Sequence, residues 1–225
     1  MKCNYEFCAE YINTWIDAML DSNNVLLSAW YGLHDWTKAH MANVLYPLAE
    51  RLGYYNKYGT GFQQEYYNVD FTLYNYREQS VWSLDYAVEH ENDEFILKDG
   101  KISQKGWFDE FAKLLPLKCA KARVIIGYDR FKDKNLFEAK LERCHELLTN
   151  DYVKPSLADS SIFLIIFPRT EYIKAGNYYN GLMHIIHFYN DNGEWEMEKD
   201  LTDKICNTDM LEKLKSIYKK IAEKY

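Results

Sequence analysis

Three features of the sequence predict an α/β (α+β) fold, with a central mixed β-sheet, helices on both faces and a helical N-terminal segment. Apolar residues recur at helical spacing near the N-terminus, alternate with polar residues in the next segments, and then switch repeatedly between the two periods. With 225 residues, 10 Gly, 4 Pro and no linker-like stretch, the chain is expected to form one domain. Its expected parts are a helical part (1–53), a central core (54–128) and an extension of sheet and helix (129–225).

The N-terminal part is expected to contain two long amphipathic helices. In the first, Tyr11, Trp15 and Met19 recur at intervals of about four residues, and residues 44–52 repeat this pattern. Asp35 is suited to cap the second helix. Gly53 is suited to end it.

The period changes to two at about Gln63, which indicates a β-hairpin. Residues 69–73 alternate apolar and polar side chains, and residues 84–89 do the same. The polar stretch 75–80 between them is expected to form the turn. The two strands should therefore pair in antiparallel fashion.

The rest of the chain alternates between helix and strand patterns. Pro116 should end the first of these helices, and the sequence Asp191-Asn192-Gly193 is a hairpin turn signal. The expected helices are Gln104–Leu115, Leu136–Leu148 and Met210–Tyr225, and the expected strands are Arg123–Tyr128, Ile162–Phe167, Leu182–Tyr189 and Trp195–Met197.

Charge and cysteine content limit the class of protein. Lys and Arg number 27 against 34 Asp and Glu, a net charge of −7, so any nucleic-acid surface must be local. The 5 Cys are scattered without a C-x-x-C pair, which favours a reducing compartment. No signal peptide or long apolar run is evident, so we expect a cytoplasmic protein without a membrane partner.

The most informative segment carries three acidic residues in the expected hairpin. Alternation places Glu89 and Glu91 on one face of their strand, about 7 Å apart. If the hairpin aligns Asp70 with Glu89, three carboxylates meet. Like charges raise one another's pKa, so the cluster is unfavourable unless a cation neutralises it. Oxygen ligands of this kind suit Mg²⁺ or Mn²⁺.

These residues resemble the active site of the PD-(D/E)XK nuclease-like superfamily, which has the restriction-endonuclease-like fold. In that family an Asp opens one strand, and Glu-x-Lys, or Glu-x-Glu in some restriction enzymes, lies on the next antiparallel strand. Asp70 matches the Asp, and Glu89-His90-Glu91 matches the Glu-x-Glu variant. The order helix, hairpin, helix, strand over residues 35–128 also looks like the family's core. No Pro precedes Asp70, and Glu91 stands where the commoner Lys would be.

The resemblance implies a nuclease that hydrolyses DNA with a divalent ion. Asp70 and Glu89 would hold Mg²⁺ (or Mn²⁺), and Glu91 would bind a second ion or act as a general base. In many members of the family a helix before the hairpin adds a Glu. Glu50 is the candidate for that position, with Glu65 as a second possibility.

A group of basic residues near the strand at 123–128 offers contacts to phosphate. Lys118, Lys121 and Arg123 are the candidates for a position beside the acidic site. Their alternative interpretation is a solvated strand end that balances nearby acids.

A second interpretation of the whole motif stays open. Exposed strands often carry alternating carboxylates, so residues 88–92 are also compatible with the solvated face of a sheet. The corresponding function is a catalytically inactive module of the same fold that binds a protein or nucleic acid. Binding of a divalent metal distinguishes the two hypotheses, and a homo-oligomer is compatible with both.

Overall fold

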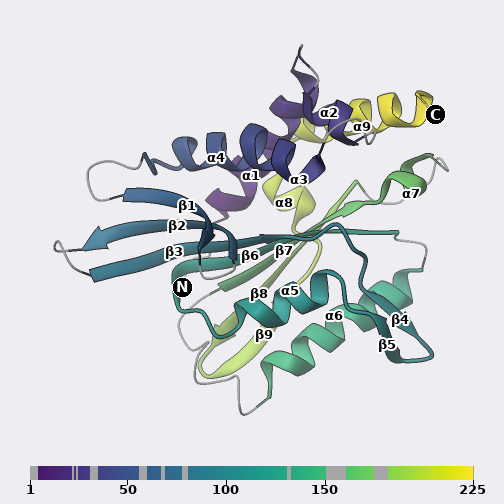
Figure 1. The fold of residues 1–225 in the computed structure, drawn as a ribbon. Coiled ribbons are helices and arrows are strands. Elements are labelled where there is room, and N and C mark those ends of the chain that lie inside the picture. Colours follow the sequence, from purple (N-terminus) through teal and green to yellow (C-terminus); the bar gives the residue numbers. More distant parts are fainter. Residues whose placement is uncertain are drawn as a thin grey trace.

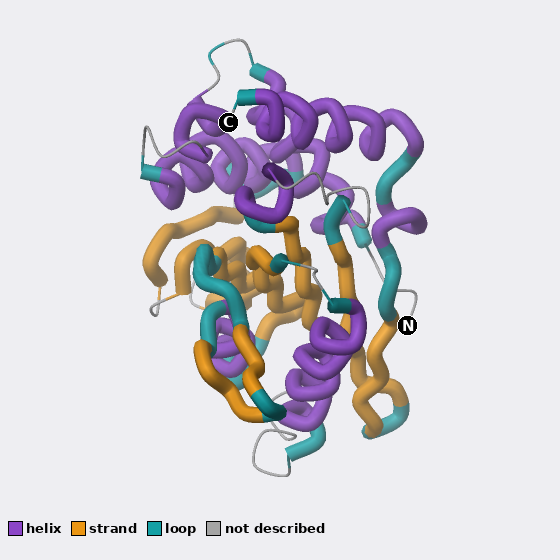
Figure 2. The backbone as a smooth tube through the Cα atoms, turned by 90° about the vertical axis from the view of Figure 1, so that its right-hand side faces the viewer, coloured by secondary structure: helices purple, strands orange, loops and turns teal. Residues whose placement is uncertain are grey.

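The computed structural model describes residues 5–21, 23, 25–30, 35–55, 60–66, 69–77, 81–130, 133–150, 161–174 and 182–224. In this part of the chain, a seven-stranded mixed sheet is covered by helices on both faces (Figures 1 and 2). The N-terminal segment is helical. The predicted fold class is therefore confirmed.

The sheet combines two antiparallel ends with a parallel centre. Its order is β1-β2-β3-β6-β7-β8-β9, and only the β3–β6 and β6–β7 pairs are parallel. The carboxyl ends of β3, β6 and β7 therefore meet at one edge, where β2 begins. The strands are β1 (Thr60–Tyr66), β2 (Val69–Arg77), β3 (Val81–His90), β6 (Cys119–Asp129), β7 (Ser161–Pro168), β8 (His184–Asp191) and β9 (Glu194–Glu198).

Two helical layers enclose the sheet (Figure 1). One layer contains α1 (Glu6–Leu20), α2 (Val25–Trp30), α3 (Trp36–His40), the π-helical segment η1 (Met41–Leu45), α4 (Tyr46–Arg51), α8 (Thr202–Ile205) and α9 (Thr208–Glu223). The opposite layer contains α5 (Trp107–Leu114) and α6 (Lys134–Leu148), while α7 (Thr170–Lys174) follows β7. Among the described helices, none has both the length and the apolar character needed to cross a bilayer.

Alternating side chains of the strands divide the core into two clusters. Phe71, Val88 and Ile126 pack toward the N-terminal helices, whereas Ala87 and Ile125 pack toward α5 and α6. Because neighbouring residues in a strand face opposite sides, these positions fix the face of every residue near the end of β3.

The predicted helix ends in the N-terminal part are confirmed. The Asp35 side chain accepts a hydrogen bond from the main-chain N–H of Lys38 at the start of α3. Gly53 has φ 85° directly after α4, a conformation that favours glycine. The second long helix is continuous but includes the π-helical segment η1.

Two predictions about the hairpins need correction. The stretch 75–80 is not all turn, because β2 continues to Arg77, while residues 78–80 lie outside the described part. A small hairpin, β4 (Ile96–Lys98) and β5 (Lys101–Gln104), occupies a segment that was not predicted as strand, so α5 starts at Trp107 rather than at Gln104. Asp99 and Gly100, both with positive φ, form its turn, and Asp-Gly is a turn signal.

The start of α5 is fixed against the segment that follows β3. Gly106 has φ 44°, and a Cβ at this position would lie 2.4 Å from main-chain atoms of Asp93 and Glu94. The N–H of Trp107 donates to the carbonyl of Asp93 at 3.2 Å. Only glycine permits this close approach, which holds α5 beneath the end of β3.

Candidate functional site

Asp70 and Glu89 are neighbours on adjacent strands. Phe71 pairs with Val88, and this register places Asp70 across from Glu89 on the face that α5 covers. Oδ2 of Asp70 accepts a hydrogen bond of 2.9 Å from the main-chain N–H of His90. The side chain of Glu89 is only 1% exposed. The structure thus brings together the two residues that the sequence predicts as metal ligands.

Lys113 of α5 completes this group, although its sequence pattern did not single it out. Its Nζ lies 2.7 Å from Oε1 of Glu89 and 3.0 Å from Oε2 of Glu110. The available signal was the Glu110–Lys113 spacing of three residues on a helix whose other face buries Trp107 and Phe111. The helix that connects two parallel strands packs on the sheet. Polar residues beside its apolar face, such as Lys113, can therefore reach side chains at the end of β3.

The electrostatic environment of Glu89 is unusual for a carboxyl group. Burial, followed by repulsion from Asp70 and Glu110, raises the pKa of Glu89, although Lys113 acts in the opposite direction. Burial acts to lower the pKa of Lys113, but its hydrogen bonds with Glu89 and Glu110 raise it above the ordinary value. A proton or another cation is therefore strongly favoured beside Glu89.

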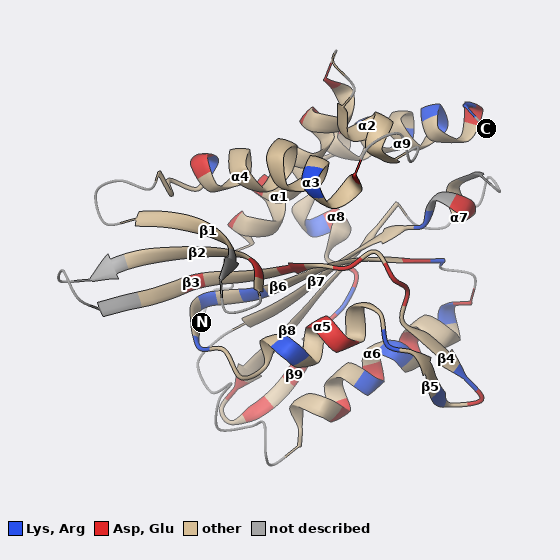
Figure 3. Cartoon of the chain, viewed as in Figure 1, with Lys and Arg blue, Asp and Glu red and all other residues tan. Residues whose placement is uncertain are grey.

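Glu91 lies just beyond β3, on a continuation of the strand. Its N–H donates to the carbonyl of Ile126 at 2.9 Å, and its Oε1 accepts a hydrogen bond of 2.7 Å from the N–H of Asp93. Its side chain is half-buried. Burial, with the Asp93 and Glu110 charges, raises the pKa of Glu91. Acidic residues gather along this segment beside α5 (Figure 3).

The two additional acidic candidates have different positions. Glu50 is exposed on α4, in the helical layer on the opposite face of the sheet from Lys113, so the prediction that it joins the acidic site is wrong. Helical periodicity does not indicate which face of a sheet a helix will cover. Glu65 lies between two residues of β1 that pair with Phe71 and Val69, so its backbone position is aligned with Asp70. Its side chain lies outside the described part.

The three predicted phosphate contacts lie away from the acidic residues. Lys118 and Lys121 are near the start of β6, whereas Ile125, which pairs with Glu89, lies later in that strand. Lys121 instead donates a hydrogen bond of 3.1 Å to the Tyr54 hydroxyl and lies 3.5 Å from a carboxylate oxygen of Asp85.

Arg123 requires a correction as well. Its side chain is fully buried, and its guanidinium donates to the carbonyls of Leu114 and Leu117 at the end of α5. The guanidinium is thus bound to main-chain carbonyls in the interior, so it is not accessible to a phosphate.

His90 turns to the other side of β3 and joins a buried aromatic group. Its Nε2 lies 3.1 Å from the Tyr128 hydroxyl and accepts a hydrogen bond of 3.3 Å from Trp36 Nε1. His40 stacks on the His90 ring at 4.0 Å, and Tyr11 contacts Nε2 of His40 at 2.9 Å. Burial lowers the pKa of His90 to about 3, so this imidazole is neutral at physiological pH.

A second charged cluster fixes α6 to the same edge of the sheet. The Lys140 side chain is 1% exposed, and its Nζ lies 2.5 Å from Oδ2 of Asp129 and 3.4 Å from Oε1 of Glu94. Arg130 lies 3.0 Å from the other oxygen of Glu94. Two cations thus balance two carboxylates, and we assign this cluster a structural role.

Comparisons with known proteins do not identify a relative. No family model, curated protein or solved structure matches the chain. A function must therefore be argued from the residues at the end of β3.

The acidic residues fit a magnesium ion in their donor chemistry. Within the described ranges, no three His, Cys, Asp or Glu side chains form a group ready to hold a metal. Mg²⁺, however, is commonly bound by one or two carboxylates, with water and substrate phosphate supplying the remaining oxygens. Asp70 and Glu89 provide such a pair on adjacent strands.

Proposed function

We propose that the chain is a metal-dependent nuclease that hydrolyses phosphodiester bonds of DNA, similar to the PD-(D/E)XK superfamily. The observation that carries this proposal is the cross-strand pair of Asp70 and Glu89 with the Lys113 ammonium beside it. The β2–β3 hairpin, the crossover helix α5 and the parallel strand β6 also support it, because the order helix, hairpin, helix, strand is the one to which the resemblance points.

Each residue of the site has a distinct role in this proposal. Asp70 and Glu89 provide carboxylate oxygens for Mg²⁺ or Mn²⁺. When bound, such an ion polarises a phosphate and lowers the pKa of water. Glu91, a half-buried carboxyl whose pKa lies above the ordinary value, accepts the proton of the attacking water.

Lys113 supplies the positive charge that the family's usual Lys would provide from the strand. Its ammonium is held by Glu89 and Glu110, and its side chain remains 36% exposed. It can therefore donate to a phosphate oxygen as negative charge develops there. Glu91 occupies the strand position of the family's usual Lys. Lys113 of α5 supplies the site with a cation in its place.

The direct test is cleavage of single-stranded and double-stranded DNA by the purified chain with Mg²⁺ or Mn²⁺. Asp70→Asn and Glu89→Gln should each lower the rate at least about 100-fold, since both remove a metal ligand. Asp109→Asn is the matched control, because Asp109 is an exposed carboxylate on α5 that pairs with Lys105. Its rate should equal that of the unaltered chain.

Two results would overturn the nuclease proposal. One is undiminished cleavage by the Asp70 and Glu89 variants, and the other is the absence of cleavage by the unaltered chain with either ion. If DNA binding persists without cleavage, the alternative is favoured, namely a catalytically inactive module of the same fold. The neutralisation of Glu89 by Lys113 is compatible with that alternative.

A further inference from the structure

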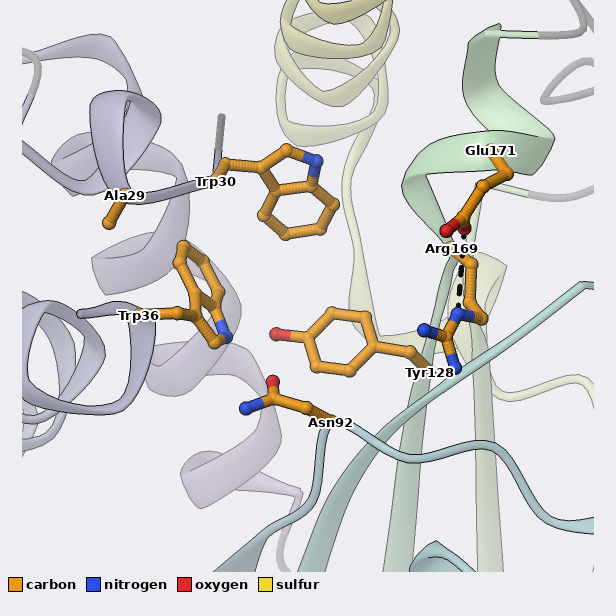
Figure 4. A pocket seen from close by; sticks show the side chains of 7 residues that line it. All are labelled: Ala29, Trp30, Trp36, Asn92, Tyr128, Arg169 and Glu171. Atoms are coloured by element: carbon orange, nitrogen blue, oxygen red, sulfur yellow. Dashed lines mark ion pairs between the residues drawn. The ribbon is translucent and has the colours of Figure 1, made fainter. Parts of the chain in front are cut away.

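An aromatic cavity opens at the same edge of the sheet, on the opposite side of β3 from the acidic residues. Its volume is about 200 Å³. Sites for drug-sized ligands usually measure about 300–1,000 Å³, so this cavity suits a smaller group. Figure 4 shows its lining side chains, which come from five separate segments: Ala29, Trp30, Trp36, Asn92, Tyr128, Arg169 and Glu171.

Three rings form the apolar wall of the cavity, and no two of them are parallel. Trp30 meets Trp36 at 89° and Tyr128 at 74°, while Trp36 and Tyr128 meet at 70°. A flat aromatic group can therefore stack on one ring while its edge contacts another. The Trp36 and Tyr128 rings are held by their contacts with His90, so this wall is preformed.

Polar side chains complete the lining: in Figure 4, Asn92 lies near the hydroxyl end of Tyr128, and Arg169 and Glu171 lie toward its other end. Asn92 is exposed, and its amide offers both a donor and an acceptor, a combination that matches the edge of a nucleobase. Nε of Arg169 lies 3.5 Å from Glu171, and one of its terminal nitrogens points toward Tyr128 in Figure 4. A cationic Arg in the lining disfavours a quaternary ammonium ligand, although three aromatic rings would otherwise suit one.

We infer that this cavity binds one nucleobase of a nucleic acid. Trp30, Trp36 and Tyr128 would provide the stacking surface, Asn92 would read the base edge, and Arg169 would contact the adjoining phosphate. Asn92 directly follows Glu91 in the chain, so the base would sit at the same edge of the sheet as the acidic residues, but on the opposite face. The aromatic and amide lining by itself indicates a flat ligand with a polar edge. The choice of a nucleic acid as that ligand rests on the proposed function.

The test is binding of the four deoxynucleoside 5′-monophosphates, measured by the quenching of tryptophan fluorescence with a chelator present. Deoxyribose 5-phosphate, which lacks a base, and choline serve as comparison probes. We expect at least one nucleotide to bind, deoxyribose 5-phosphate to bind about tenfold more weakly or not at all, and choline not to bind. Asn92→Ala should weaken nucleotide binding roughly tenfold.

The matched control is Asn135→Ala, which alters another exposed Asn, at the start of α6. It should leave nucleotide binding unchanged. The inference would be overturned by equal affinities for nucleotide and deoxyribose 5-phosphate, by an unchanged affinity of Asn92→Ala, by preferential binding of choline, or by no binding of any nucleotide at millimolar concentration.

These outcomes are separate from those of the cleavage test, because no metal and no hydrolysis are involved. A chain that binds nucleotides as expected but does not cut DNA keeps this inference and loses the proposed nuclease function. A chain that cuts DNA through Asp70 and Glu89, but binds nucleotides and deoxyribose 5-phosphate equally well, keeps the proposed nuclease function and loses this inference.

Discussion

The ammonium of Lys113 lies 2.7 Å from Oε1 of Glu89, and it joins a crossover helix to the buried end of a strand. This ion pair is asymmetric, since the Glu89 side chain is 1% exposed and that of Lys113 is 36% exposed. Without Lys113 the Glu89 carboxylate would be buried and unpaired, whereas without Glu89 the Lys113 ammonium could still be solvated by water.

Removing the ammonium should destabilise the fold. We expect Lys113→Met to lower the free energy of unfolding by about 1–3 kcal/mol, less than for a fully buried pair because Lys113 is partly exposed. Adding Glu89→Gln should recover most of this loss. Denaturant unfolding of the two single variants and the double variant measures the coupling. Lys105→Met, which breaks an exposed pair on the same helix, should change stability by no more than about 0.5 kcal/mol.

Divalent ions should stabilise the folded chain through Asp70 and Glu89. An ion that binds only the folded state adds about 2.7 kcal/mol at a hundredfold excess over its Kd. Mg²⁺ or Mn²⁺ should thus raise the melting temperature, and Asp70→Asn should abolish the rise, whereas the control Asp109→Asn should retain it. An equal rise in all three proteins would mean that the ion binds elsewhere.

Glu91 should show opposite effects on activity and stability. Because burial raises its pKa, its negative charge is less favourable in the folded chain than in the unfolded chain, and Glu91→Gln should leave stability unchanged or slightly higher. The same variant should slow DNA cleavage at least about 100-fold if Glu91 is the base. The amide oxygen can still accept from the N–H of Asp93, whereas Glu91→Ala loses this bond and should be less stable than Glu91→Gln. Paired rate and melting measurements decide this, and a fully active Glu91→Gln chain would exclude the assigned role.

His187 should make the fold sensitive to acid. Burial lowers the pKa of this histidine of β8 to about 4, although the Glu198 charge acts in the opposite direction. The unfolded chain therefore takes up a proton near pH 6.5, before the folded chain does. The free energy of unfolding is therefore highest above pH 6.5. It falls by on the order of 2 kcal/mol as the pH decreases from 6.5 through about 4. His187→Phe should show a shallower decline in stability over this range, and equal slopes would contradict the prediction.

Gly106 should be intolerant of any side chain. Gly106→Ala combines a positive φ with a clash against the main chain of Asp93 and Glu94, so we expect a loss of at least about 2 kcal/mol. Gly100→Ala is the matched control, since Gly100 of the β4–β5 turn also has a positive φ, but a Cβ added there would have no atom within 4 Å. The difference between the two melting temperatures measures the clash together with the glycine-only backbone conformation of Gly106, and equal losses would show that α5 can shift.

The cross-strand acidic pair could be predicted from sequence because it depends on local rules. Alternation fixes the face of Asp70 and Glu89, and the short connection between the strands requires antiparallel pairing. The same rules could not place Lys113. Its position depends on how α5 is rotated above the sheet, which is set by contacts such as the close approach of Trp107 to Gly127 of β6.

The basic residues were misplaced for a related reason. A charged residue in a strand is usually solvated, so the pattern around Arg123 gave no sign that its guanidinium would be buried. That burial becomes favourable only because α5 ends beside β6 and presents the carbonyls of Leu114 and Leu117. Such compensation belongs to the tertiary structure and is not encoded in the period of a single segment.

The two types of strand pairing at this edge imply an order of assembly. Asp70 and Glu89 meet through an antiparallel hairpin of nearby residues, so their contact requires the closure of only a short loop. Arg169 reaches the aromatic cavity only after β7 has paired in parallel with β6, across a much longer loop. We therefore expect hydrogen-exchange protection during refolding to appear in the acidic hairpin first. The cavity wall should form in a later and slower step.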